Sequence, residues 1–154
     1  MPEEPTGNHK PCPFCKIVEG ATEADVVLRQ GDVLALLDHR PLVEGHVLVV
    51  PTRHVQTMMD LPDAQVGPLF VVAKRMARAL DAALEAPGAL IMVNNRVSQS
   101  VHHLHVHVIP RRFQDGLFSK PFFWSRRKPA SAEARAAMLL RLRAALAEEA
   151  ASSL

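Results

Sequence analysis

Three histidines alternate with apolar residues in one short segment of this sequence, VHHLHVHVIP at residues 101–110. Successive side chains of a β-strand point to opposite faces, so an extended Val101–Ile109 would place His103, His105 and His107 on one face. The leucine and valines between them would face a core. Imidazole is a nucleophile, a hydrogen-bond donor and a metal ligand, so the row predicts a site for an anionic or metal-bound ligand. A buried histidine cluster without chemistry is the alternative.

Two kinds of chemistry suit such a row. At a rise of about 3.3 Å per residue, the first and last rings lie roughly 13 Å apart, whereas Zn–N bonds measure about 2.0–2.1 Å. The three parallel rings therefore cannot close on one ion. His103 and His105 alone could bind a catalytic zinc, but the segment contains no acidic residue to act as its base. In phosphate chemistry, a neutral imidazole attacks phosphorus while its neighbours donate hydrogen bonds or protonate a leaving group.

The alternating histidines match the pattern His-φ-His-φ-His-φ-φ, where φ is apolar, and the segment resembles the signature of the histidine-triad family. The resemblance extends over about residues 12–112. It is carried by Cys12–Val18, Leu36–Asp38, Gly45–Val55, Gln99–Val101 and Pro110–Arg111. The first of these stretches is similar to the N-terminal signature of bacterial members, and the next two are similar to their central hairpin.

The resemblance implies a nucleotide hydrolase or transferase that releases a purine nucleoside monophosphate. It implies that His105 attacks the α-phosphorus to form a nucleotidyl-histidine, which water then hydrolyses. His107 would hydrogen-bond the phosphate or the leaving group, His103 would flank it, and His46 would support the triad. Dinucleoside polyphosphates are the expected substrates. Nucleoside phosphoramidates or acyl-adenylates are the alternative, and a mononucleotide-binding dimer without turnover is another.

The same resemblance assigns residues around the nucleotide. Asp38 matches the acidic residue that binds the ribose hydroxyls, although an Asx-turn ahead of Pro41 is the alternative. Leu37 is expected to line the base pocket. The phosphate is expected to be held by Asn94, Gln99 and Ser100. In this loop the sequence departs from the family, because Arg96 stands where glycine is common and the loop is shorter.

The two cysteines both lie in the motif Cys12-x-x-Cys15. A structural disulfide is disfavoured in a cytosolic chain, and a thioredoxin-like redox pair would need a strand before it and a helix opening at it. Two thiolates need two more ligands for a closed tetrahedral zinc site. Resemblance to zinc-containing bacterial members implies that His54 and His103 supply them around a structural Zn²⁺. The alternative is a metal-free pair of thiols.

The composition describes an ordinary globular chain. Its 154 residues suffice for one domain with a core, and 48% of them are hydrophobic and 22% charged. No apolar run approaches the length of a membrane span, and the polar start lacks the apolar segment of a signal peptide. We expect a disordered tail over residues 1–10, a single histidine-triad domain over residues 11–150, a cytoplasmic location and no membrane partner.

Positive charge is concentrated after the triad. This stretch holds Arg111, Arg112, Lys120, Arg126, Arg127 and Lys128, against one acid, Asp115. It is either a solvated loop or a surface that attracts a polyanionic substrate. No nucleic-acid motif accompanies it, so specific nucleic-acid binding is not expected. The nearby Phe122, Phe123 and Trp124 could cover the mouth of the site or bridge two subunits, since members of the family are commonly homodimers.

The hydrophobic periodicity predicts an α+β fold. Strands are expected over Val26–Arg29, Val33–Leu37, His46–Val50, Ala89–Val93 and Val101–Ile109. A long helix is expected from near Pro62 to just before Pro87, and a C-terminal helix is expected to be capped by Ser131. Together they predict a five-stranded antiparallel sheet with one long covering helix and a C-terminal helix, which is the histidine-triad fold.

Overall fold

The computed structural model describes residues 11–119 and 128–153. Its five strands form one antiparallel sheet in the order β1-β2-β3-β5-β4. The strands are β1 (Val26–Gln30), β2 (Val33–Leu37), β3 (Val47–Pro51), β4 (Gly88–Val93) and β5 (Val106–Arg111). The predicted five-stranded sheet is therefore confirmed. The expected tail over residues 1–10 and the aromatic residues 122–124 lie outside the described residues.

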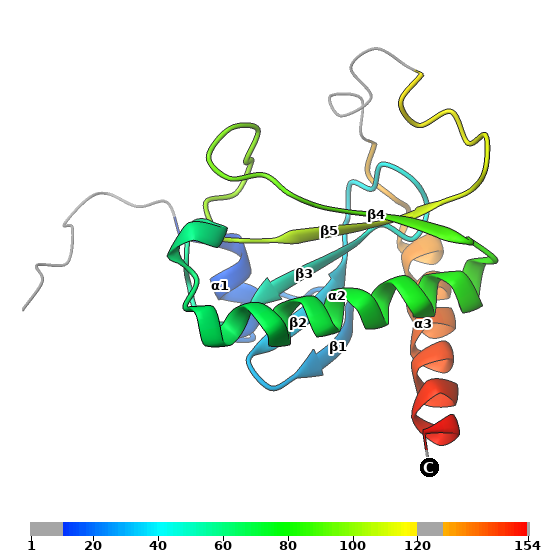
Figure 1. The fold of residues 1–154 in the computed structure, drawn as a ribbon, viewed down its shortest axis with the longest axis horizontal. Coiled ribbons are helices and arrows are strands. Elements are labelled where there is room, and N and C mark those ends of the chain that lie inside the picture. Colours follow the sequence, from blue (N-terminus) through cyan, green and yellow to red (C-terminus); the bar gives the residue numbers. More distant parts are fainter. Residues whose placement is uncertain (1–10, 120–127, 154) are drawn as a thin grey trace, which may run out of the picture.

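Three α-helices accompany the sheet in the described part of the chain: α1 (Pro13–Val18), α2 (Asp63–Leu84) and α3 (Ala132–Ser152). Figure 1 shows α2 lying along the sheet, with α1 near one end of α2 and α3 near the other. The long helix and the C-terminal helix are confirmed, and Ser131 caps α3 by accepting a hydrogen bond from the amide of Ala134. The sequence analysis missed α1 and a short 3₁₀ turn at Met58–Asp60.

The strand register decides which side chains share a face. Residues directly opposite each other on antiparallel strands point to the same face. Leu36 pairs with Leu48, and Leu48 pairs with His107, so these three side chains lie on one face. Leu37 belongs to the opposite face, which packs against α2 in the main apolar core. The face of Leu36 carries a smaller buried apolar cluster of Phe14, Leu34, Leu36, Leu48 and Val50.

The triad segment is only partly a strand, which corrects the expected strand over Val101–Ile109. The pairing of β5 with both β3 and β4 stops at Val106, so residues 101–105 lie outside the sheet. Instead, the amide of Leu104 donates to the carbonyl of Val55 at 2.8 Å. The inward and outward alternation nevertheless continues, because Leu104, Val106 and Val108 all lie in the main core.

Two residues at the ends of β3 differ from ordinary strand positions. Pro51 was expected to stop this strand but is its last residue, paired with Val33. Gly45 precedes the strand with φ +92°, and a Cβ there would lie 2.5 Å from Leu84 Cδ1. The left-handed φ favours glycine here, and it brings His46 to the start of β3. No helix in the described residues is long and apolar enough to cross a membrane.

Candidate functional site

The three triad rings gather on the face of the sheet that α1 covers. His103, His105 and His107 are 0%, 5% and 2% exposed. The ring centroids of His105 and His107 lie 4.9 Å apart. The ring of Phe14, in α1, lies 5.5 Å from that of His103 and 5.4 Å from that of His105. The structure therefore brings all three predicted histidines together, although the first two precede the strand.

The central ring, His105, is oriented by the main chain. Its Nδ1 lies 2.8 Å from the carbonyl oxygen of His103. A carbonyl only accepts, so Nδ1 carries the hydrogen and Nε2 of the neutral ring keeps its lone pair. Burial lowers the pKa of His105, which favours this neutral form. The sequence pattern alone gave no means of identifying the acceptor.

The third ring, His107, is held by His46. The amide of Leu42 donates to His46 Nδ1 at 3.1 Å, and His46 Nε2 lies 2.9 Å from His107 Nδ1. Burial, followed by the neighbouring His107 and His105, lowers the pKa of His46 to about 3, so the ring is neutral. Its hydrogen must then be on Nε2, which donates to His107 Nδ1. In the neutral His107 ring, the hydrogen is consequently on Nε2.

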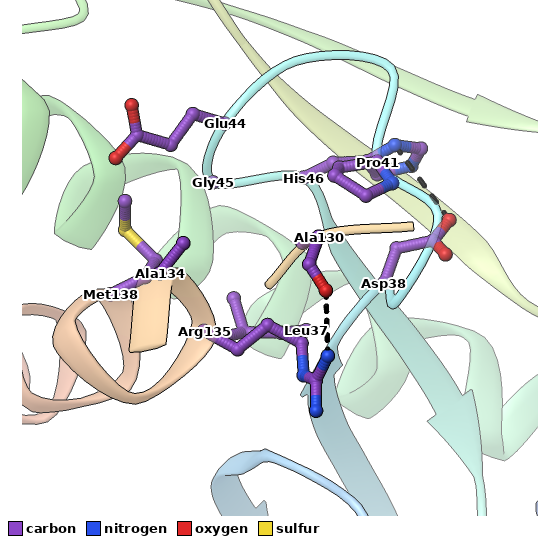
Figure 2. Close-up of a pocket in the computed structure, with 10 residues that line it drawn as sticks. All are labelled: Leu37, Asp38, Pro41, Glu44, Gly45, His46, Ala130, Ala134, Arg135 and Met138. Atoms are coloured by element: carbon purple, nitrogen blue, oxygen red, sulfur yellow. Dashed lines mark hydrogen bonds and ion pairs between the residues drawn. The ribbon is translucent and has the colours of Figure 1, made fainter. Parts of the chain in front are cut away.

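Asp38 lies beside His46 at the end of β2. Its Oδ1 accepts from the amide of Arg40 at 2.9 Å, which is the Asx-turn considered as the alternative. Its Oδ2 lies 3.7 Å from His46 Nδ1, the pair joined by a dashed line in Figure 2. Because His46 is neutral and its Nδ1 already accepts from the main chain, we interpret this pair as a polar contact and not as a salt bridge.

The loop after Asp38 is anchored to the start of α3. The amide of Ala130 donates to the carbonyl of His39 at 3.0 Å, and Arg135 donates to the carbonyl of Ala130 at 2.8 Å. Figure 2 shows Ala130 and Arg135 lining a small cavity together with Asp38 and His46. The cavity measures about 30 Å³, which holds a water molecule but not a nucleotide.

The loop before the triad is closed by its own side chains. Gln99 accepts from the amide of Arg96 at 2.8 Å and donates to the carbonyl of Gln56 at 2.6 Å. Arg96 has φ +68°, a left-handed conformation that suits the glycine common at this position. Both ends of the Gln99 amide are thus engaged within the chain. Asn94 is half-buried and Ser100 is exposed in the same loop.

Leu37 does not lie on the triad face. Its side chain belongs to the core under α2, one position out of register with Leu36 and His107. Leu37 also lines the small cavity beside Asp38 and His46. Its contact with the base of a nucleotide stays a prediction. The strand pairing places Leu36 on the triad face. With Leu36, the triad face also carries the half-buried Ile17 and Val18 of α1.

Four residues from three separate segments converge at the start of the triad. His103 Nδ1 lies 3.3 Å from Cys12 Sγ, 3.6 Å from Cys15 Sγ and 3.2 Å from His54 Nδ1. All four donor atoms lie within 4.8 Å of one another. With Zn–S bonds of about 2.3 Å and Zn–N bonds of about 2.0 Å, a tetrahedral site has ligands about 3.3–3.8 Å apart. The spacing of this four-ligand cluster (Cys12, Cys15, His54 and His103) therefore fits zinc.

The protonation states in the four-ligand cluster also suit a cation. His103 Nε2 donates to the carbonyl of Pro51 at 2.8 Å, so Nδ1 turns its lone pair toward the sulfur atoms. Burial, together with Cys12 beside it, raises the pKa of Cys15 to about 11. If both cysteines are thiolates, their adjacent negative charges need a compensating positive charge, which a divalent ion supplies.

His105 belongs to no metal-spaced cluster among the residues that the structure describes. Its Nδ1 faces the carbonyl of His103, while the side chain of His103 faces the cysteines. The alternative of a catalytic zinc held between these two histidines therefore has no geometric support.

Two of the basic residues that follow the triad, Arg111 and Arg112, are hydrogen-bonded within the chain. Arg111 binds Asp115 through two hydrogen bonds of 2.6 and 2.7 Å and holds the pKa of that carboxyl well below its usual range. Arg112 donates to the carbonyl of Leu84 at the end of α2 at 2.6 Å. The guanidinium groups of Arg111 and Arg112 therefore already bind acceptors within the chain. Lys120, Arg126 and Arg127 lie outside the described residues.

Comparison with known proteins identifies one family. The HIT domain family, named after the histidine triad, matches residues 19–114. A HIT-like protein of Mycobacterium tuberculosis is 36% identical over 121 residues, which cover 77% of this chain and 84% of that protein. An adenosine 5′-monophosphoramidase of Candida albicans is 30% identical over 111 residues, which cover 68% and 73%.

A solved structure has a similar fold over most of this chain. The zinc-bound histidine triad family protein from Mycobacterium smegmatis is 36% identical to this chain and has a TM-score of 0.80. The match covers 92% of this chain and 97% of that protein. The similarity therefore includes most of the fold on which the triad and the four-ligand cluster are built.

Proposed function

Because this chain belongs to the histidine-triad family, we propose that it is a nucleotide hydrolase or transferase that acts through a covalent nucleotidyl-His105 intermediate. The orientation of His105 is the observation that carries this proposal. The hydrogen bond from Nδ1 to the carbonyl of His103 leaves the Nε2 lone pair as the nucleophile. Its neutral form at ordinary pH supports the same role.

The proposed reaction has two steps. In the first, His105 Nε2 forms a bond to the α-phosphorus while the bond from phosphorus to the leaving group breaks. His107, with its hydrogen on Nε2, donates to the phosphate or protonates the leaving group. In the second step, water attacks the phosphorus and breaks the P–N bond, which releases a nucleoside monophosphate and regenerates His105.

We propose that the nucleotide lies on the triad face. The base would contact the apolar side chains of Ile17, Val18 and Leu36. The carboxylate of Asp38, which accepts from the amide of Arg40, would also accept from the ribose hydroxyls. The phosphate would be held in the loop before the triad, by Asn94, Gln99 and Ser100.

The surroundings of the triad also bear on which leaving group the substrate carries. Arg111 and Arg112 are hydrogen-bonded within the chain, which weakens the case for a long polyphosphate. Similarity to an adenosine 5′-monophosphoramidase favours a small leaving group. We therefore propose purine nucleoside phosphoramidates or acyl-adenylates as the first substrates, and dinucleoside polyphosphates as the second class.

One experiment tests both the reaction and the substrate. AMP release is measured from an adenosine phosphoramidate and from a diadenosine polyphosphate at equal concentrations, with His105→Ala as the control. A His105 peptide that carries a covalently bound AMP group, trapped in a single turnover and found by mass spectrometry, is the expected intermediate. Tight AMP binding without turnover of either substrate would instead support a non-catalytic nucleotide-binding protein.

We also propose that the four-ligand cluster binds Zn²⁺. The support is the donor spacing, the tautomer of His103 and the zinc-bound family member of similar fold. Metal analysis of the purified protein is expected to give one zinc per chain. Absence of zinc, together with failure to bind added Zn²⁺, would contradict this assignment.

Finally, we propose a homodimer. Strand β4 lies at the edge of the sheet, with Ile91 41% exposed. Helix α2 packs beside it and exposes Phe70 and Val71. Exposed apolar side chains next to a free strand edge suit pairing with a second copy. Light scattering is expected to give twice the chain mass, and Ile91→Lys is expected to give the monomer.

A further inference from the structure

His103 joins the four-ligand cluster to the proposed nucleophile. Its Nδ1 faces the two sulfur atoms, and its Nε2 donates to the carbonyl of Pro51. Its own carbonyl accepts from His105 Nδ1 at 2.8 Å. Any shift of the His103 side chain that moves its main chain therefore moves the acceptor that fixes the tautomer and the rotation of His105.

Phe14 provides a second, independent link. It lies between the two cysteines in the sequence and is 6% exposed. Its ring packs against that of His103 at an interplanar angle of 78° and against that of His105 at 58°. The helix that carries the cysteines therefore also carries a side chain in contact with the nucleophile.

Helix α1 needs an anchor to hold this position. It has six residues, and a helix of this length is not stable by itself in water. Its Ncap residue is Cys12, whose Sγ accepts from the amide of Cys15 at 3.5 Å. Apart from the apolar contacts of Phe14, Ile17 and Val18, its attachment to the triad runs through the cysteine sulfur atoms.

We propose that Zn²⁺ in the four-ligand cluster positions the nucleophile, by fixing the main chain of His103 and the ring of Phe14 against His105. Cys12, Cys15, His54 and Phe14 are then positioning residues, and none of them touches the substrate. The effect on turnover rests on the proposed function, whereas the effect on the orientation of His105 does not.

His54 offers the cleanest test. It is an exposed ligand, and the contacts described for its ring are with Cys15 and His103. His54→Asn therefore weakens the metal site without changing a residue that contacts His105. His102→Asn, which changes an exposed histidine next to His103, is the matched control. For each protein we would measure zinc content, the thermal unfolding midpoint, kcat and KM, and the ¹⁵N and ¹H resonances of the His105 ring.

The expected result separates positioning from binding. His54→Asn should lose zinc and should lose the hydrogen-bonded Nδ1–H resonance of His105. Its kcat should fall by roughly 10- to 100-fold, the range for residues that orient catalytic groups, while KM changes little. The control should match the wild type in all four measurements. A folded, zinc-free His54→Asn with the wild-type His105 resonances would overturn the proposal.

Two further outcomes remain decisive. If no protein releases nucleotide, the proposed function fails, while the His105 resonances still report whether zinc orients the ring. If His54→Asn does not fold, the wild-type protein is loaded with Cd²⁺, a larger ion that also binds thiolates. Wider ligand spacing should then shift the His105 ring resonances relative to the zinc form, and identical resonances in the two metal forms would overturn the proposal.

Discussion

At one end of the triad the ring of His103 faces two sulfur atoms, whereas at the other end the ring of His107 faces another imidazole. The His103 end includes the exposed His54 and half-buried cysteines. The His107 end is buried, and its chain of hydrogen bonds starts at the amide of Leu42. The first arrangement has the ligands of the proposed zinc site, whereas the second has two neutral rings beside the carboxylate of Asp38.

His105 therefore lies between two histidines, His103 and His107, whose positions are fixed in different ways. The tautomer of His107 follows from folding alone, because a main-chain amide sets it through His46. Under the proposed zinc assignment, the position of His103 depends in addition on an ion that solution conditions can remove. Metal removal should therefore act mainly at the His103 end, and a change of pH mainly at the His107 end. The orientation of His105 should respond to both.

The largest effect is expected from His105→Ala, which removes the residue between the two ends. Loss of a nucleophile should lower kcat/KM by at least about 1,000-fold. The fold should survive, with a loss of roughly 1–2 kcal/mol in the free energy of unfolding. Steady-state kinetics and urea unfolding check both expectations. A variant that keeps near-normal turnover would remove His105 from its proposed role.

Next in size is Cys12→Ser, which tests whether the His103 end requires a cation. A structural zinc site adds its binding free energy to folding, so the variant should lose at least about 3 kcal/mol in the free energy of unfolding. Wild-type protein treated with a chelator should unfold at the same urea concentration as the variant. An unchanged midpoint after chelation would show that the His103 end is stable without metal.

A pair of substitutions at His46 tests the His107 end. His46→Gln keeps an amide near the position of Nε2 and can still donate to His107, whereas His46→Asn is one methylene shorter and cannot reach it. We expect roughly a 10- to 100-fold loss of kcat in the asparagine variant and a smaller loss in the glutamine variant. If His46 only fills space in the core, the two kcat values should agree, since the side chains differ by a single methylene.

The acid stability of the protein provides a smaller effect at the same end. Burial, with neighbouring histidines as the next cause, lowers the pKa of His46 and of His107 to about 3, against 6.5 in the unfolded chain. The unfolded state therefore binds more protons between pH 6.5 and 3, so stability is full above pH 6.5 and falls below it.

The free energy of unfolding should decrease by at most about 1.4 kcal/mol per pH unit for each of the two histidines. Urea unfolding between pH 7 and 4 measures this slope. In His46→Gln the slope should be shallower by the contribution of one proton. Equal slopes in the two proteins would mean that His46 is charged in the folded state.

Much of this arrangement was predictable from the sequence, because its signals are local. Strict alternation at His103, His105 and His107 put the rings on one face, and the Cys-x-x-Cys motif predicted two members of the four-ligand cluster. The long helix and the strand at Val33–Leu37 followed from apolar periodicity. These features depend on neighbours a few residues apart, which a sequence displays directly.

The features that were not predicted from the sequence depend mostly on contacts between distant residues. That Leu36 and not Leu37 shares the triad face follows from the pairing of β2 with β3. The start of β5 at Val106 follows from where β3 and β4 end. Helix α1 was missed because six residues carry little periodicity. The partners of Arg111 and Arg112 became visible only in the folded chain.

The smallest effect is expected from Arg111→Gln, beyond the His107 end of the triad. Because Arg111 already binds Asp115 and stacks on Phe118 at 4.8 Å, its charge is largely balanced within its own turn. We expect the ratio of kcat/KM for a diadenosine polyphosphate to that for a phosphoramidate to change by less than about threefold, since a balanced charge steers an anion weakly. Added salt should likewise affect the variant and the wild type equally. A drop of tenfold or more, confined to the polyphosphate, would mean that Arg111 leaves Asp115 to bind substrate, and the His107 end would then contribute a charge as well as neutral rings.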